Sequence, residues 1–298
     1  MMNGAASTGD IELIVDEVFN PKADAWKRFR ANKAAMLGLG WAILLVLIAV
    51  FATVIQRYDP KKISPLDSLK GPSRRHWFGA DLLGRDVWSR IVNGSRISLS
   101  VAIGVVFTSL VLSLVVGALS GYRGGFIDAA FMRFADIILA LPYVPVLLAF
   151  TSLLGRKVWV LVFAIVAISW MSTARLFRAG VLQVKSLDYV EAAKASGAST
   201  WRIIFRHIVP NAIQPVIVSV AFSIGTAVLL ESVFSFLGIG LDPATPAWGV
   251  MVGDARQYVT SSAHLFFFPA SALVLTVLAF TFIGDGLRDA LDPKMRGL

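Results

Sequence analysis

The chain has 298 residues, of which 56% are hydrophobic and 16% are charged, and its formal net charge is +9. Soluble domains are far less apolar, so this composition excludes an ordinary soluble protein and indicates that lipid surrounds most of the chain. The absence of cysteine excludes disulfides, thiolate metal sites and cysteine nucleophiles, and three histidines argue against a histidine-rich metal site.

The amino-terminal stretch is acidic. The first 21 residues contain four acidic residues and no Lys or Arg. A cleaved secretory signal starts with basic residues and an early apolar run, so we expect no cleaved signal and a first span that is retained as an anchor. Residues 22–33 combine Trp26 and Phe29 with basic side chains. This pattern predicts a short interfacial helix within segment 1–34, or else a plain basic flank.

Six segments are long and apolar enough to cross a bilayer as helices. A helix rises about 1.5 Å per residue, so about 20 apolar residues cross the hydrocarbon core, and helices satisfy their own backbone polar groups there. We therefore predict an all-α, polytopic membrane protein with a six-helix transmembrane domain over residues 35–298. The spans are expected at 35–56, 98–120, 130–153, 158–177, 212–236 and 265–286.

Prolines and glycines interrupt these spans. Pro142 and Pro145 lie in the third span and Pro215 begins the fifth, which predicts kinks or broken helices because proline removes a helical hydrogen bond. Three glycines within spans lack a side chain and would allow close helix contact or bending, namely Gly104, Gly117 and Gly225.

A polar, helix-prone segment separates the fourth and fifth spans. Ser186 is suited to cap a helix that begins at Leu187, and the alanines after Glu191 favour its continuation. Gly197 breaks this run and permits a turn. A second short helix is expected over 199–208.

Pro210 is expected to end that second helix before the fifth span. The two helices should project from the membrane. On pattern alone, they serve either to dock a soluble partner or only to connect two spans.

Charged residues within spans are costly, about 2.5–3.5 kcal/mol at the centre on insertion scales, and therefore mark candidate functional sites. The candidates are Arg133, Asp136, Glu231 and Asp285. They would serve an intramembrane hydrolase, or else pair across the bundle or reach toward the membrane surface. The sequence contains no HExxH motif, which argues against a zinc protease.

The sequence also contains no GxxxxGK[ST] loop to hold a nucleotide. We expect no cofactor and no metal in this chain, so any ATP and Mg²⁺ that drive transport would bind to separate ATPase subunits. The basic residues flank spans, where they meet anionic lipid headgroups, so we expect membrane lipids and not nucleic acid as their partners.

The polar segment resembles the EAA loop of ABC importer permeases: Glu-Ala-Ala, three residues, a glycine, then nine residues to Ile-x-Leu-Pro. His207 and Val209 replace the usual Ile and Leu, and the run from Arg206 to Asn211 resembles the peptide-importer branch instead. The positions that we assign to ATPase coupling are Glu191, Ala192, Ala193, Gly197, Arg202 and Pro210.

Further blocks in the same order strengthen this resemblance, which covers roughly residues 22–296. They are FGADLLGRD at 78–86, SRISL at 95–99, MRFADIILALP at 132–142, SFLGIG at 235–240 and GDGLRDALDP at 284–293. Together they are similar to the C-type permease subunit of the dipeptide/oligopeptide (peptide/nickel) importer family.

The resemblance implies a type I ABC importer permease fold and a non-catalytic subunit that moves di- or oligopeptides into the cytoplasm. The implied partners are a homologous second permease, two cytoplasmic ATPase subunits, an extracytoplasmic substrate-binding protein and the peptide. Residues 191–197 would sit in a groove of one ATPase and act as a rigid lever. Glu191 would orient this helix, Ala192 and Ala193 would allow close approach, and Gly197 would make the turn.

The same resemblance implies the topology. The coupling loop, expected over 178–211, must be cytoplasmic, which puts both termini inside a bacterial plasma (inner) membrane and residues 57–97 outside. With that topology the inner segments hold 16 Lys or Arg and the outer segments 12, a slight bias in the expected direction. The basic residues of 57–97 would contact the binding protein or peptide, or else pair within the loop.

Three other interpretations remain open from the sequence. The same machinery would serve for nickel, because the permease motifs are shared. An intramembrane hydrolase and a passive channel or scaffold are the alternatives of other classes.

Overall fold

The computed structural model of the chain describes residues 21–292. The expectation about a cleaved signal therefore concerns residues outside this range. Within it, the chain forms helices and one isolated bridge between Ala80 and Asp86, and no strand, which confirms the all-α prediction. The helices up to the fourth span are α2 (Pro21–Ala31), α3 (Lys33–Val50), α4 (Ala52–Ile55), α5 (Val87–Arg123), α6 (Gly125–Leu139), α7 (Tyr143–Leu154) and α8 (Val158–Lys185).

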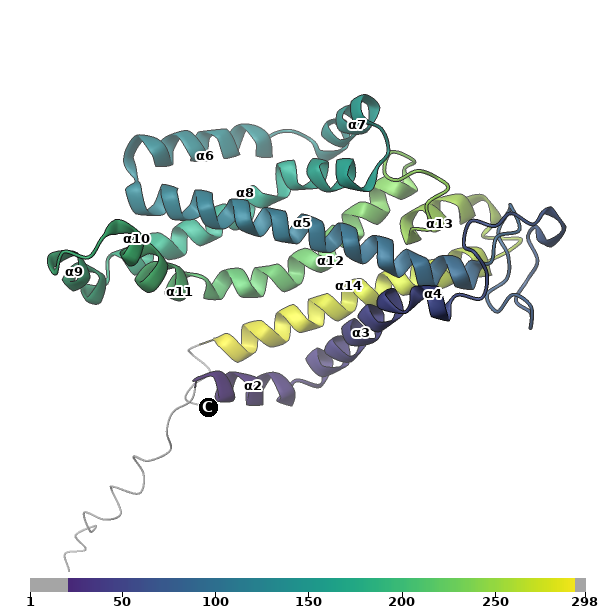
Figure 1. Cartoon of the computed structure of the whole chain (residues 1–298), viewed down its shortest axis with the longest axis horizontal. Coiled ribbons are helices and arrows are strands. Elements are labelled where there is room, and N and C mark those ends of the chain that lie inside the picture. The colour runs from purple at the N-terminus through teal and green to yellow at the C-terminus, as the bar shows by residue number, and fades with distance from the viewer. Residues whose placement is uncertain (1–20, 293–298) are drawn as a thin grey trace, which may run out of the picture.

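The remaining helices are α9 (Asp188–Ala195), α10 (Thr200–Ile203), the π-helix Ile204–Ile208, α11 (Val209–Ala212), α12 (Gln214–Phe236), α13 (Trp248–Ala255) and α14 (His264–Leu291). Short 3₁₀ turns lie at Pro65–Asp67 and Arg256–Tyr258. The long helices lie side by side, with α5 along α8, α12 against α14, and α14 against α3 (Figure 1).

Five of these helices, α3, α5, α8, α12 and α14, are long and apolar enough to cross a membrane. The sixth predicted span, 130–153, is not one helix, because α6 and α7 meet at an angle of 87°. The break follows from Pro142, which adopts an extended backbone (φ −72°, ψ 135°) and caps α7. Proline also disfavours a helical backbone at the residue before it, so α6 ends upstream. The predicted break is therefore confirmed, and the continuous span is corrected to a bent helix pair.

Two predicted loop boundaries are also wrong. Residues 87–97 are not loop but the first turns of α5, which begins after Asp86 accepts a hydrogen bond from the Ser89 amide at 2.9 Å. Likewise α8 continues to Lys185, so residues 178–185 are helix and not part of a loop. Both helices extend past their apolar stretches, where hydropathy gives no signal for helix.

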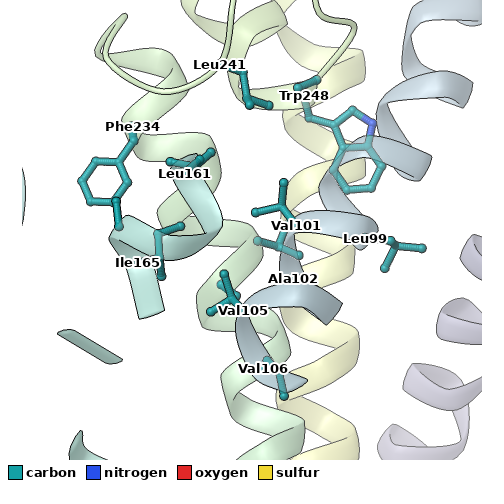
Figure 2. Packing of buried hydrophobic residues seen from close by; sticks show 14 of the residues in the cluster. Leu99, Val101, Ala102, Val105, Val106, Leu161, Ile165, Phe234, Leu241 and Trp248 are labelled. Atoms are coloured by element: carbon teal, nitrogen blue, oxygen red, sulfur yellow. The ribbon is translucent and has the colours of Figure 1, made fainter. Parts of the chain in front are cut away.

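The interior is built where α5, α8, α12 and α13 meet (Figure 2). Val101 and Val105 of α5, with Leu161 and Ile165 of α8, are almost completely buried there. Trp248 at the start of α13 is 1% exposed, and its indole N–H donates to the Ile91 carbonyl at 3.0 Å. Close packing of this kind holds spans together in lipid, because lipid tails are as apolar as the helices and the hydrophobic effect does not drive the spans to associate.

Gly117 lets α5 and α8 approach closely, as predicted. A Cβ atom at this position would lie 2.9 Å from the Ala174 carbonyl oxygen and 2.9 Å from the Phe177 ring. At Gly225 the nearest atoms, on Val277 and Phe280 of α14, would be at 3.4 Å, which is an ordinary contact. Gly117 is therefore one position at which α5 and α8 require the absence of a side chain. Gly121, one turn later, is another, because a Cβ there would lie 2.7 Å from the Val181 side chain of α8.

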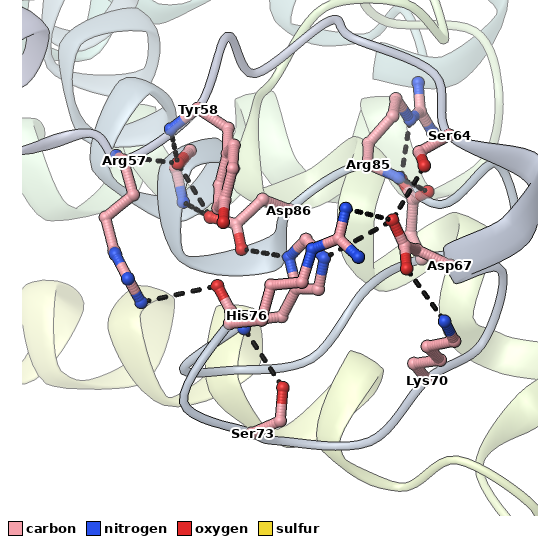
Figure 3. A network of polar contacts seen from close by, with 12 residues as sticks. Arg57, Tyr58, Ser64, Asp67, Lys70, Ser73, His76, Arg85 and Asp86 are labelled. Carbon is pink, nitrogen blue, oxygen red and sulfur yellow. Dashed lines mark hydrogen bonds and ion pairs between the residues drawn. The ribbon is translucent and has the colours of Figure 1, made fainter.

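The segment 56–86, between α4 and α5, is held by a buried polar network (Figure 3). His76 Nδ1 lies 2.8 Å from the Asp86 carboxylate, and Lys70 donates to Asp67 at 2.8 Å. The hydrogen bond from Lys70, with that from Ser64, holds the pKa of Asp67 well below its usual range. Several basic side chains of this segment are thus paired within it, as one of the two sequence interpretations expected.

The predicted amino-terminal helix is present as α2. Its Phe29 is buried against Ala35 and Ala290, while Trp26 is half exposed and stacks on Phe29 with ring centroids 5.7 Å apart. The location of α2 at a membrane surface stays a prediction. In Figure 1, α2 and the end of α14 lie toward the end of the molecule that carries α9–α11, away from segment 56–86.

Candidate functional site between α8 and α12

Residues 186–212, here called the protruding segment, extend beyond the ends of α8 and α12 (Figure 1). The segment contains two short helical parts that meet near Gly197, as the sequence predicted. The first is α9, and the second runs through α10, the π-helix and α11. All six predicted coupling residues lie within it.

The charges at its two ends, and not a capping side chain, favour the formation of α9. Asp188 and Glu191 occupy its first turn and Lys194 its last, where they complement the helix dipole. Ser186 does not cap this helix as predicted, because its hydroxyl donates to the Gln183 carbonyl at 2.9 Å and so closes α8. Leu187 occupies the cap position of α9 without a side-chain hydrogen bond.

Gly197 ends α9 in a left-handed turn. Its φ is +76°, its amide donates to the Lys194 carbonyl, and the Ala198 amide donates back to the Ala193 carbonyl at 3.1 Å. This is a Schellman motif, and it requires a residue that tolerates positive φ. A Cβ at Gly197 would meet no atom of this chain within 4 Å, so the turn and not a clash demands glycine.

The protruding segment is anchored and not loose. Val190 of α9 is completely buried against Phe177 and Val181 of α8 and against Ile204 and Ile208 of the π-helix. This cluster fixes α9 to the ends of the spans.

The opposite face of α9 is open to a partner. Glu191, Ala192 and Lys194 are exposed, and Ala193 is half-buried. Neither Glu191 nor Lys194 forms an ion pair with any residue in the described part of the chain. A small-residue surface with one free carboxylate and one free ammonium is therefore available for contact.

The second helical part differs from the prediction at Pro210. Proline does not end the helix, because it lies inside α11 directly after the π-helix Ile204–Ile208. A proline lacks the amide hydrogen and crowds the carbonyl four residues before it, here that of Arg206. The π-helix widens the turn at this place and lets the helical path continue toward α12. Arg202, in α10, is exposed, and its backbone amide donates a hydrogen bond to the hydroxyl oxygen of the capping residue Ser199 at 3.4 Å.

Two aromatic residues of this part escaped the sequence interpretation. Trp201 and Phe205 are 67% and 62% exposed, and their rings stack with centroids 5.5 Å apart. Ile203, Ile204 and Ile208 of the same part are buried, whereas the i,i+4 spacing of Trp201 and Phe205 puts these two rings on a separate face. They form an exposed apolar surface beside α9.

The charged residues within spans do not form a common centre. Glu231 is completely buried and accepts hydrogen bonds from Ser98 at 3.0 Å and Ser235 at 2.9 Å. Asp136 pairs with Arg175 at 2.5 Å, across α6 and α8. Arg133 and Asp285 are exposed. Over residues 21–292 no hydrogen bond joins any two of the four, and no cluster of three His, Cys, Asp or Glu side chains suited to a metal occurs.

Comparison with known proteins identifies the family. Residues 113–297 match the family of binding-protein-dependent transport system inner membrane components, and residues 20–72 match the N-terminal transmembrane domain of oligopeptide transport permease C. The first match covers more than half of the 298-residue chain.

Relatives match nearly the whole chain. The oligopeptide transport system permease protein OppC of Bacillus subtilis is 39% identical over 98% of this chain and 96% of its own length. The dipeptide permease DppC of Alkalihalophilus pseudofirmus is 39% identical over 93% of this chain and 91% of its own. The glutathione permease GsiD of Escherichia coli O6:K15:H31 is 40% identical over 95% of this chain and 93% of its own length.

The fold also has a solved counterpart. A chain of the inward-facing MetNI methionine ABC transporter is similar with a TM-score of 0.56, over 68% of this chain and 97% of that one, at 19% identity. The all-helical fold, the match over residues 113–297 and these relatives agree: the chain belongs to the binding-protein-dependent transport system inner membrane components, the non-catalytic permease subunits of ABC importers.

Proposed function

We propose that this chain is the permease subunit of an importer that moves peptides into the cytoplasm. The observation that carries this proposal is the set of relatives at 39–40% identity over more than nine-tenths of the chain, whose names specify oligopeptide, dipeptide and glutathione transport. These names give no support to nickel as the substrate. The structure likewise gives no support to a hydrolase, because the four charged residues within spans have separate surroundings: Glu231, Asp136, Arg133 and Asp285.

We infer that the complete transporter contains this chain, a second homologous permease, two ATPase subunits that hold ATP and Mg²⁺, and a substrate-binding protein. The family of permease subunits to which this chain belongs supports these partners. The protruding segment would be cytoplasmic, as would both termini, and segment 56–86 would face the binding protein.

The ATPase would dock on the exposed face of α9. Glu191 and Lys194 are free to pair, Ala192 and Ala193 permit close approach, and Arg202 lies on the neighbouring helix. The buried Val190 on the opposite side supports a rigid connection to α8 and α12. Closure of the two ATPases would then push α9 and change the side of the membrane to which the pathway opens.

Uptake in proteoliposomes tests the substrate. The full complex with its binding protein should import a labelled tripeptide only when ATP is present, and nickel should not be imported. ATP hydrolysis that is stimulated by a different solute, with no peptide uptake, would contradict the proposal.

Cross-linking tests the docking face. Because the chain has no cysteine, Lys194→Cys introduces a single thiol on α9. It should cross-link to an ATPase subunit that carries a cysteine in its permease-facing groove. Lys62→Cys, an exposed position of segment 56–86, is the matched control and should give no such product. Equal cross-linking from both positions would argue against docking on α9.

A further inference from the structure

A cavity of about 370 Å³ lies among α5, α7, α8 and α12. Its lining residues fall near the middle of three long spans: 105–110 of α5, 165–176 of α8 and 219–230 of α12. Tyr143 of α7, next to the break after α6, completes the lining. The cavity therefore lies about halfway along the membrane-crossing part of the chain and is open on one side.

The lining combines hydroxyl groups with the absence of charge. It contains no Lys, Arg, His, Asp or Glu among the described residues that form it. Thr226 and Ser172 are exposed at this surface, although a surface that faces lipid gains nothing from hydroxyl groups. A neutral polar recess in a span bundle is suited to a polar occupant that carries its own variable charge.

The α12 side of the cavity presents hydrogen-bond acceptors. Ser219 donates to the Val216 carbonyl at 2.8 Å, Ser223 to Ser219 at 2.8 Å, and Thr226 to Phe222 at 3.0 Å. Each hydroxyl has one proton and two lone pairs, so these three have used their donors within the helix. What they offer the cavity is lone pairs.

The side formed by α7 and α8 presents donors. The hydroxyls of Tyr143, Ser172 and Thr173 have no hydrogen-bond partner among residues 21–292. Their protons are therefore free to be donated to an occupant. The two sides of the cavity differ in hydrogen-bonding character, with acceptors on α12 facing donors on α7 and α8.

A peptide backbone matches this arrangement, because it carries N–H donors and C=O acceptors at every residue. We propose that this cavity binds the backbone of the transported peptide in transit. The peptide's N–H groups bond to Ser219, Ser223 and Thr226, and its carbonyls accept from Tyr143, Ser172 and Thr173. The proposal rests on the proposed peptide-import function, and it explains how one pathway accepts peptides of different side-chain charge.

A charge placed in the cavity tests this directly. Thr226→Lys and Thr226→Glu are made in the full complex, and import of Ala-Lys-Ala and Ala-Glu-Ala is measured in proteoliposomes. The same binding protein delivers both peptides to every variant, so its own preference cancels when each variant's uptake ratio is divided by the wild-type ratio. Thr226→Lys should lower the Ala-Lys-Ala to Ala-Glu-Ala ratio at least about tenfold, and Thr226→Glu should raise it similarly, because the added charge is poorly screened there.

If the charged variants do not assemble into the complex, variants that each remove one cavity hydroxyl test the same proposal. Tyr143→Phe, Ser172→Ala and Thr173→Val each remove one donor and should slow import at saturating loaded binding protein about fivefold for each bond lost. Ser100→Ala is the matched control, since Ser100 is an exposed hydroxyl of α5 that bonds to the Ile97 carbonyl and lies outside the cavity. It should import at the wild-type rate.

The outcomes separate the two proposals. A wild-type complex that imports neither peptide with ATP would refute the proposed function. Import of both peptides by the wild type, with unchanged ratios in assembled Thr226 variants, would leave the function standing and refute the cavity as the peptide site. An import rate equal to that of the wild type in all three hydroxyl variants would also refute the cavity as the peptide site.

Discussion

At the residue scale, Gly197 acts through its backbone conformation and Asp67 through its charge. Gly197 adopts a left-handed conformation in the turn between α9 and α10. Asp67 is 2% exposed and is stabilised by Lys70, Arg75 and Ser64 around it. Each of these features allows a prediction with a conservative control.

Replacing Gly197 should uncouple ATP hydrolysis from import. Gly197→Val forces a β-branched residue into positive φ, at a cost of about 1–2 kcal/mol, and shifts the end of α9. Gly197→Asn is the control, because asparagine tolerates this conformation. We expect the Val variant to hydrolyse ATP while peptide uptake falls at least tenfold, and the Asn variant to keep most of its uptake. Wild-type uptake per ATP in the Val variant would show that α9 is not a lever.

Acidification should loosen segment 56–86 through Asp67. The pKa of Asp67 is lowered in the folded state, first by the Lys70 hydrogen bond. Its contribution to stability is therefore complete above the usual aspartate pKa of about 3.9 and is lost as pH falls from there through the lower folded value. The melting temperature of purified wild-type chain should exceed that of Asp67→Asn at pH 7 and pH 5, and this difference should shrink below pH 4. A difference that grows on acidification would contradict the assigned sign.

At the element scale, the span bundle depends on close approach of helices, and the protruding segment depends on one buried anchor. α5 and α8 meet at Gly117, whereas α6 is joined to α8 by Asp136–Arg175 and by the Asp128–Arg178 pair, in which two bonds measure 2.5 Å each. α6 buries only Ala135 among its described residues. α6 is therefore attached to α8 mainly by ion pairs, whereas α7 packs its buried Leu147 into the interior and α5 packs along α8.

A side chain at Gly117 should destabilise the α5–α8 pair. Gly117→Val puts new atoms within 2.9 Å of Ala174 and Phe177, and overpacking of this kind costs about 1–3 kcal/mol. Gly40→Val, in α3, is the matched control, because a Cβ there meets no atom within 4 Å. Thermal unfolding in detergent should show a lower midpoint for Gly117→Val and little change for Gly40→Val. Equal midpoints for both variants would show that the α5–α8 contact yields without cost.

At the scale of the whole molecule, the two ends of the bundle differ in kind. One end carries α9–α11, α2 and the end of α14, and the other carries segment 56–86 and α13 (Figure 1). The first end has the free charges and exposed aromatic pair that suit a soluble partner, and the second has a buried polar network. The cavity lies between them.

Labelling single cysteines should establish the orientation. In the cysteine-free chain, Lys62→Cys should react with a membrane-impermeant maleimide on the outer face of intact membranes, and Lys194→Cys only after permeabilisation. The reason is that the proposed ATPase-docking face on α9 would be cytoplasmic. The reverse labelling pattern would overturn the proposed topology and the docking face together.

The sequence by itself determined the all-α class, the positions of five of the six spans and the presence of two short helices around Gly197. These features are local: bilayer thickness sets the length of an apolar run, and helix propensity and glycine act within a few residues. Only the tertiary structure decided that α5 begins at Val87, that a π-helix lets the chain pass Pro210, and that Trp201 and Phe205 face outward. It also brought Tyr143, Ser172 and Thr226 to one cavity. The cavity depends on contacts between residues far apart in the chain, and hydropathy and periodicity do not record such contacts.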